Sequence, residues 1–327
     1  MTKVKTLNFF IFSFLFYSFF FKVSILDAES HLGNDLGLTS IETNNRTEYF
    51  KVSLIENEDY DKYDIWEGKK PPFELKDVND DGRTMVIHMP ANQKVKNNKA
   101  VLLVPGGGYE NTMIGLPINF GKKLQKEGYE VFVLDYRVAK NNYHYPVQFQ
   151  EIVRALKWVK SKSDRWNFDA ERTGAVGFSA GGHLVSFLAT RYDLKPYENL
   201  DEIDELSPRP AYHGLVYPVI SFDAEISHNG SVVNFTGMKI PSDEQRDFFS
   251  NELHVSVKTP EAFIVHSWED ELVKAENSLR YFQALRKNEV KSALHLFESG
   301  PHGVGLGKPD MDFSFWPIMM IFWMNNK

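Results

Sequence analysis

A serine lies between two glycines in the pentapeptide Gly-Phe-Ser-Ala-Gly at residues 177–181. This pattern allows a serine to occupy a sharp turn between a strand and a helix, where its hydroxyl group faces the substrate. The turn holds the serine in strained backbone angles, and a side chain at either glycine would collide with the neighbouring strand or helix. Residues 173–178 read as a strand and 180–190 as a helix. Ser179 is therefore predicted to be a nucleophile that attacks an acyl carbon.

A serine hydroxyl is a weak nucleophile, so a histidine must take its proton and a carboxylate must orient that histidine. Where the serine lies on such a turn, the chain order is serine, acid and then histidine, which puts the base after the last strand. His302 lies in a Gly- and Pro-rich loop directly after the strand expected at 293–297, and is the predicted base. His266, at the end of an expected strand, is its rival. We expect His295, inside a strand, and His183, in the helix after the serine, to serve in packing or capping.

The acid should follow the strand before that one, which we expect at 262–266. Glu269, Asp270 and Glu271 occupy the loop after it. Asp270 is the predicted acid, because aspartate is the commoner acid in such triads and a helix follows it. The two glutamates are expected to be solvated loop charges. Asp223, which follows an earlier strand, stays open as an alternative acid.

A second glycine-rich segment, Pro-Gly-Gly-Gly-Tyr at 105–109, directly follows a buried strand expected at 100–104. In proteins with a serine turn, an amide from such a loop joins the amide after the serine to bind the negatively charged oxygen of the tetrahedral intermediate. The segment could also be a flexible turn or a phosphate-binding loop. However, it has neither the Gly-Lys-Ser/Thr ending of a Walker loop nor the Gly-x-Gly-x-x-Gly of a dinucleotide loop.

These residues need a sheet that brings strand ends together, and the chain from about residue 51 alternates short β-rich runs with helical patterns. Such alternation predicts an α/β fold with a mainly parallel sheet and helices on both faces. Strands are expected at 85–89, 100–104, 131–136, 173–178, 214–217, 262–266 and 293–297, and helices at 118–127, 147–160, 180–190, 276–287 and 313–324. Residues 193–210 and 223–249 lack clear periodicity, and we expect both to be insertions over one end of the sheet, where active-site lids are usually found.

Composition excludes several other kinds of chemistry. The formal net charge is −7 and no basic stripe is present, which argues against a nucleic-acid partner. Cysteine is absent, which excludes disulfides, Cys-ligated zinc and a thiol nucleophile. The acidic stretch at 77–82 lacks the ligand spacing of a calcium loop and reads as a turn. No metal motif is found, and we expect neither a metal nor a cofactor.

The first residues have the pattern of a targeting signal, because Lys3 and Lys5 precede an apolar run at 7–21. The run is shorter than a spanning helix, so we predict a signal peptide at 1–28, a linker at 29–50 and a single domain at 51–327. The protein would then be exported, to the periplasm or the extracellular space, with no stable membrane span after cleavage. Leu26 is a poor match to the cleavage rule, which leaves an uncleaved membrane anchor as the alternative.

With these motifs placed, the chain resembles the α/β-hydrolase esterases related to bacterial acetyl-xylan and feruloyl esterases. The resemblance runs from about residue 64 to the C-terminus. Its motifs are Ile-Trp-Glu-Gly at 65–68, Pro-Gly-Gly-Gly-Tyr at 105–109, Gly-Phe-Ser-Ala-Gly-Gly-His at 177–183, Tyr-Pro-Val-Ile at 217–220, Asp-Glu-Leu-Val at 270–273, Asn-Ser-Leu at 277–279 and Gly-Pro-His-Gly at 300–303. The ordered set is far more specific than any single motif.

The resemblance implies an α/β-hydrolase fold and a triad of Ser179, Asp270 and His302. It also implies oxyanion-binding amides from Gly107 or Gly108 and from Ala180. Acetyl groups on plant polysaccharide, or other small esters, are the implied substrates. The chain departs from the family pattern at Lys274, where proline is frequent, and at Pro301, where glycine is common; both positions could alter the loops around the acyl pocket.

Two other functions fit part of the pattern. A serine exopeptidase of the prolyl-oligopeptidase type shares the serine turn and the chain order of the triad, but such enzymes usually carry a large propeller domain for which this chain has no room. A catalytically silent relative used for binding would be indicated by the loss of a triad residue, and none is lost. The sequence therefore favours an esterase that works through an acyl-serine intermediate.

Overall fold

The structure, a computed structural model, describes residues 60–73 and 84–327. All of them belong to one compact unit of the chain, Asn57–Lys327. The predicted signal peptide at 1–28, the predicted linker at 29–50 and the acidic turn at 77–82 lie outside the described residues.

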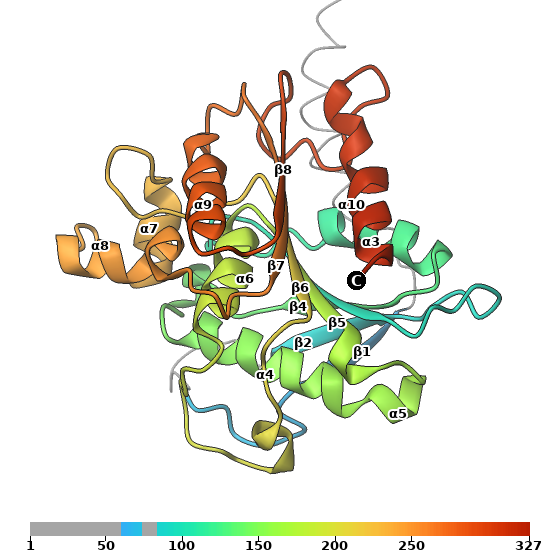
Figure 1. The fold of residues 1–327 in the computed structure, drawn as a ribbon. Coiled ribbons are helices and arrows are strands. Elements are labelled where there is room, and N and C mark those ends of the chain that lie inside the picture. Colours follow the sequence, from blue (N-terminus) through green and yellow to red (C-terminus); the bar gives the residue numbers. More distant parts are fainter. Residues whose placement is uncertain (1–59, 74–83) are drawn as a thin grey trace, which may run out of the picture. The chain divides into compact units, whose positions relative to one another are not determined.

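An eight-stranded sheet forms the centre of this unit (Figure 1), in the order β1-β2-β4-β3-β5-β6-β7-β8. The six strands from β4 to β8 in that order are parallel, and β2 runs antiparallel to both its neighbours. The strands are β1 (Asp61–Asp64), β2 (Met85–Met89), β3 (Ala100–Val104), β4 (Glu130–Asp135), β5 (Thr173–Phe178), β6 (Tyr212–Val216), β7 (Glu261–Ser267) and β8 (Ser292–Phe297). The predicted mainly parallel sheet is thus confirmed.

Helices cover both faces of the sheet. In Figure 1, α3 and α10 lie on one side, and α4, α6 and α9 lie on the other. The α-helices are α3 (Gly115–Lys126), α4 (Val147–Ser161), α5 (Ser163–Trp166), α6 (Ala180–Arg191), α7 (Asn229–Thr236), α8 (Asp243–Phe249), α9 (Glu276–Lys287) and α10 (Trp316–Asn325). Short 3-10 helices occur at η1 (Ala139–Asn141), η2 (Ala170–Arg172), η3 (Glu202–Glu205), η4 (Asn251–His254) and η5 (Asp312–Phe315).

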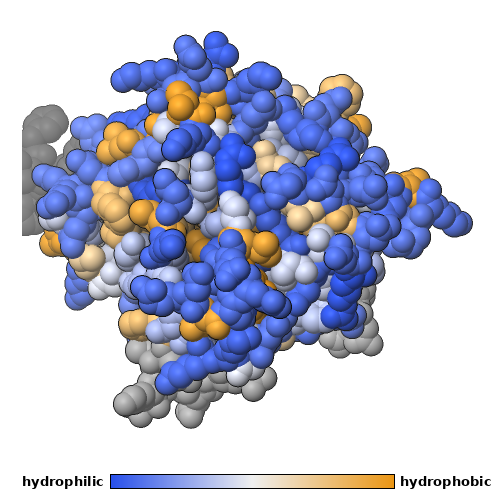
Figure 2. Space-filling model, turned by 60° about the horizontal axis from the view of Figure 1, so that its bottom comes forward, coloured by the Kyte–Doolittle hydropathy of each residue, from blue (hydrophilic) through white to orange (hydrophobic). Residues whose placement is uncertain are grey.

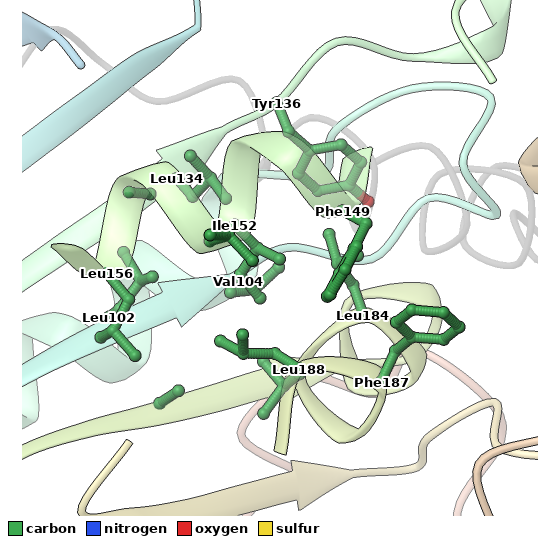
Figure 3. Packing of buried hydrophobic residues seen from close by; sticks show 14 of the residues in the cluster. Leu102, Val104, Leu134, Tyr136, Phe149, Ile152, Leu156, Leu184, Phe187 and Leu188 are labelled. Carbon is green, nitrogen blue, oxygen red and sulfur yellow. The ribbon is translucent and has the colours of Figure 1, made fainter. Parts of the chain in front are cut away.

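The main core lies between the sheet and the layer formed by α4 and α6. Figure 3 shows apolar side chains of both helices pointing at those of two central strands. They are Leu102, Val104, Leu134, Tyr136, Phe149, Ile152, Leu156, Leu184, Phe187 and Leu188. Full burial of a side chain of this size contributes about 1.5–3 kcal/mol. This packing makes the sheet a rigid support for the loops at its edges.

Residues 193–210 do not lie where we expected them. They follow α6, which begins at the carboxyl end of β5, and they lead into the start of β6. They therefore lie toward the amino ends of the parallel strands. Arg154 of α4 holds the segment through two hydrogen bonds to Asp201, of 2.6 and 2.8 Å. The prediction that this segment covers the end of the sheet where an active-site lid would lie was wrong. The segment instead packs along α4.

Residues 223–249 follow β6 at the carboxyl edge of the sheet and contain α7 and α8. Sequence patterning missed both helices because each is short, and α7 includes Gly230 and two asparagines. It also missed β1, whose four residues Asp-Lys-Tyr-Asp have no buried side chain. Such predictions depend on a regular spacing of apolar residues, and segments that are only partly buried, such as the edge strand β1, do not need that spacing.

The face of the molecule shown in Figure 2 is mainly hydrophilic, with hydrophobic residues in small groups. Small groups of this kind are normal on a protein surface. Among the described residues, no helix combines the length and the apolar character that a membrane crossing requires.

Candidate active site

Ser179 lies at the turn between β5 and α6, with φ 53° and ψ −119°. For a residue other than glycine, such angles cost on the order of 1–3 kcal/mol and persist only where the surroundings enforce them. A side-chain carbon at Gly177 would lie 2.2 Å from the carbonyl oxygen of Gly181, and one at Gly181 would lie 2.2 Å from that of Val104. Both glycines are therefore sterically required.

The structure brings Ser179, His302 and Asp270 into one chain of hydrogen bonds. The hydroxyl oxygen of Ser179 lies 2.8 Å from Nε2 of His302. Nδ1 of the same ring lies 2.6 Å from Oδ2 of Asp270. An ionised carboxylate can only accept, so Nδ1 carries a proton and Nε2 is free to accept the proton of the serine hydroxyl. This arrangement can generate a nucleophilic serine oxygen.

Asp270 is buried, and all its contacts favour the ionised form. Its Oδ1 accepts the backbone N–H groups of Leu272 and Val273, at 3.1 and 2.9 Å. Its Oδ2 accepts from His302 and, at 3.2 Å, from Nε2 of His266. Burial alone would raise the pKa of Asp270, but the hydrogen bonds from the two histidines, the charge of His302 and the backbone N–H of Val273 hold it well below its usual range.

His266, the rival base, lies behind the acid. Its Nε2 also lies 2.9 Å from the carbonyl oxygen of Val273, so Nε2 carries the proton. Its Nδ1 then accepts the hydroxyl of Ser278, at 2.7 Å. Both ring nitrogens are engaged by groups other than the serine, so His266 can fix the carboxylate of Asp270 but is not placed to take a proton from Ser179. Sequence reasoning missed this role, although the spacing of four residues from Asp270 was visible.

The other side chains considered from the sequence lie outside this chain of hydrogen bonds. Asp223, the alternative acid, pairs with Arg280 at the surface, at 2.7 Å. His295 packs its ring on Phe263 in the neighbouring strand, with centroids 4.8 Å apart. Glu269 and Glu271 are exposed, as expected.

The glycine-rich loop after β3 lies against the serine turn. A side-chain carbon at Gly106 would lie 2.8 Å from Cβ of Ser179. Gly107 and Gly108 have φ 123° and 62°, which favour glycine. Ala180 is the first residue of α6, so its N–H has no carbonyl partner within the helix. The loop and the helix start together provide amides of the kind that bind an oxyanion.

Two side chains hold this loop in place. The hydroxyl of Tyr109 lies 2.8 Å from Nδ1 of His183, and Nδ2 of Asn234 donates to the carbonyl of Gly108 at 2.9 Å. Burial lowers the pKa of His183 to about 3, so its ring is neutral. Because Nε2 of His183 donates to the carbonyl of Phe249 at 2.9 Å, its Nδ1 accepts from Tyr109. His183 thus has a structural role, as expected, and it connects the helix after the serine to the glycine loop. No sequence motif pointed to Asn234.

Within the described part of the chain, no three His, Cys, Asp or Glu side chains are grouped so that they could hold a metal ion.

Comparison with known proteins gives a consistent result. Residues 85–285 match the BD-FAE family model. An acetylxylan esterase of Xylanibacter ruminicola is 33% identical over 237 residues, which cover 70% of this chain and 45% of that protein. Endo-1,4-beta-xylanase B of Butyrivibrio fibrisolvens is 31% identical over 69% of this chain and 35% of its own length. The chain thus spans less than half the length of these two curated relatives.

A solved structure shares most of the fold. It is the acetyl ester-xyloside bifunctional hydrolase of Caldicellulosiruptor lactoaceticus, with a TM-score of 0.73 and 31% identity, over 81% of this chain and 96% of that one. Together with the eight-stranded, mainly parallel sheet, this likeness confirms the α/β-hydrolase fold expected from the sequence.

Proposed function

The chain belongs to the BD-FAE family, and from this premise we propose that it is a serine carboxylesterase that removes acetyl groups from carbohydrate esters. The observation that carries the proposal is the unbroken hydrogen-bonded path from Ser179 through His302 to Asp270, at 2.8 and 2.6 Å. The Ser179 end of this path lies against the glycine loop that follows β3, and in the proposal the backbone amides of this loop bind the oxyanion. In this proposal the three side chains are the catalytic triad.

In the first step, the oxygen of Ser179 attacks the acetyl carbonyl carbon while Nε2 of His302 takes the hydroxyl proton. The ionised Asp270 stabilises the imidazolium that forms. Negative charge then develops on the carbonyl oxygen. In this proposal the amides of Gly107 or Gly108 and of Ala180 receive it, and one such donor contributes about 3 kcal/mol to transition-state stabilisation.

In the second step, His302 gives its proton to the oxygen of the leaving alcohol, the carbon–oxygen bond of the ester breaks, and an acetyl-serine remains. Water then attacks the acetyl-serine while His302 accepts one of its protons. Return of that proton to the serine oxygen releases acetate and restores the starting state.

The proposed substrate class is supported by the relatives, two of which are named for acetylxylan or acetyl ester hydrolysis and one as a xylanase. We also propose that the protein is exported, on the pattern of Lys3, Lys5 and the apolar run at 7–21. Export would bring it to polymeric carbohydrate. Measuring the esterase activity of the cell-associated and external fractions separately tests export, which predicts activity outside the cytoplasm.

Replacement of Ser179 by alanine tests the nucleophile. We expect release of 4-nitrophenol from 4-nitrophenyl acetate to fall by about 10⁴–10⁶-fold, because attack by the serine oxygen is lost. The variant should keep the wild-type circular dichroism spectrum. Full activity in a folded Ser179→Ala variant would reject the proposed mechanism.

The substrate class is tested by comparing acetate release from acetylated xylan, ferulate release from a feruloylated sugar and amine release from a proline naphthylamide. We expect the acetylated xylan to be preferred. Preference for the naphthylamide would instead favour the exopeptidase alternative.

A further inference from the structure

His228 stands beside the glycine loop, although no motif pointed to it. It precedes α7 and caps that helix, since its Nδ1 accepts the backbone N–H of Ser231 at 3.3 Å. The Cε1 atom of the ring, which lies between the two ring nitrogens, faces the loop. A side-chain carbon at Gly108 would lie 3.8 Å from Cε1 of His228. An insertion that links β6 to β7 thus places an imidazole against a proposed oxyanion residue.

The capping contact decides which nitrogen carries the proton. A backbone N–H can only donate, so Nδ1 of His228 presents its lone pair, and the hydroxyl of Ser231, at 2.9 Å, can donate to it as well. In the neutral ring the proton therefore lies on Nε2. Across residues 60–73 and 84–327, no group forms a hydrogen bond with this Nε2. The ring is partly exposed, so the N–H can meet a bound molecule.

The ring also lies within electrostatic range of the triad. Burial lowers the pKa of His228 below its ordinary value of 6.5; the positive charge of His302 lowers it further, and the charge of Asp270 opposes this. His228 is accordingly neutral at neutral pH. It can donate a hydrogen bond there without adding a charge that would oppose protonation of His302.

The chemistry of an acetyl ester limits what this donor can bind. The acetyl group offers one acceptor, its carbonyl oxygen, and the loop amides already serve that atom in the proposed mechanism. The methyl group offers none. Every remaining acceptor belongs to the alcohol half of the ester, where a sugar carries hydroxyl and ring oxygens next to the acetylated position.

Resting on the proposed function, we propose that Nε2–H of His228 donates to a sugar oxygen on the alcohol half of the bound ester. His228 then selects acetylated sugars over acetate esters of alcohols that have no neighbouring oxygen. It acts in substrate recognition and takes no part in proton transfer.

The test compares two esters that form the same acetyl-serine, acetylated xylobiose and 4-nitrophenyl acetate, in the wild type and in His228→Asn. Asparagine keeps the capping acceptor for the helix but removes the Nε2–H. We expect kcat/KM for the sugar ester to fall roughly five- to tenfold relative to that for the aryl ester, the value of one neutral hydrogen bond. His228→Phe, which removes both the cap and the donor, should show the same relative loss, and thermal unfolding reports the cap separately.

Equal losses on the two esters would overturn the proposal, because they would indicate a third oxyanion donor or a support for the glycine loop. An unchanged ratio in both variants would overturn it as well. If the wild-type protein hydrolysed neither ester, the proposed function itself would fail, and the inference with it. The two failures are therefore distinguishable.

Discussion

Two of the buried carboxylates, Asp270 and Glu130, each accept a hydrogen bond from a buried histidine. Asp270 accepts from His266 at 3.2 Å as well as from His302. Glu130 accepts from His88 at 2.8 Å and from Lys96 at 2.9 Å. In both, burial alone would raise the pKa, but hydrogen bonds from the neighbouring donors lower it. The pairwise contact is thus the same in the two places.

Their positions in the sheet differ. Asp270 follows β7 at the carboxyl edge, where the turn at Ser179 exposes a hydroxyl. Glu130 begins β4 at the opposite edge. There the ring of His88 packs against both Phe132 and Trp166, with centroids 4.9 and 4.2 Å away. A buried histidine–carboxylate pair is therefore no sign of catalysis by itself; it needs a reachable nucleophile and nearby amides.

The largest expected difference between the two carboxylates is the effect on kcat when each is replaced by its amide. Asp270→Asn should lower kcat on 4-nitrophenyl acetate by about 10³–10⁴-fold, because an amide can hold the wrong tautomer of His302 and cannot stabilise an imidazolium. Glu130→Gln should keep kcat per folded molecule within about twofold, since none of its partners reaches the serine. Asp223→Asn is a matched control for the alternative acid. A large loss in that variant, with Asp270→Asn fully active, would reassign the acid.

His266 and His88, which donate hydrogen bonds to these carboxylates, should differ in the same way. His266→Leu should lower kcat by about 10–100-fold with KM little changed, because a buried positioning partner of the acid is lost. His266→Gln, which restores an N–H donor, should recover part of the activity. His88→Gln should leave kcat unchanged. If His266→Gln rescued nothing and KM rose in parallel, the histidine would be a packing residue.

Much of the candidate site could be predicted because it lies in segments whose conformation is dictated locally. The glycines around Ser179 indicate a turn in which no larger residue fits. Of the ten histidines, only His302 follows the last strand. Chain order then selects the loop of Asp270. Strands buried on both faces, such as β3 and β5, were recognisable as apolar runs.

The remainder depended on tertiary contacts that leave no local pattern. The sequence could not exclude His266 as the base, because the direction in which its ring points depends on the conformation at the end of β7. Asn234 lies in α7, a short helix in an aperiodic segment, and His228 directly precedes that helix. Only the packing of this segment on the glycine loop gives the two residues a place in the site. The position of 193–210 likewise followed from the direction of α6, not from its own residues.

The smallest expected effect concerns stability and pH. The hydrogen bonds to Glu130 lower its pKa below the value of 4.5 expected in the unfolded chain. A group of this kind stabilises the folded state above that pH, and the stabilisation is lost as the pH falls through the lower, folded pKa. Glutamine resembles the protonated carboxylic acid. The free energy of unfolding of Glu130→Gln should therefore be about 1–3 kcal/mol below that of the wild type at pH 7.

This gap should close as the pH falls below about 4.5, because the wild-type carboxylate then becomes protonated as well. Urea unfolding followed by tryptophan fluorescence at pH 7, 5, 4 and 3 measures it. Esterase activity at pH 7, far from the unfolding transition, should stay at the wild-type level. A gap of the same size at every pH would assign the loss to packing around the side chain, and the charge of Glu130 would then have no part in holding β4 against Lys96.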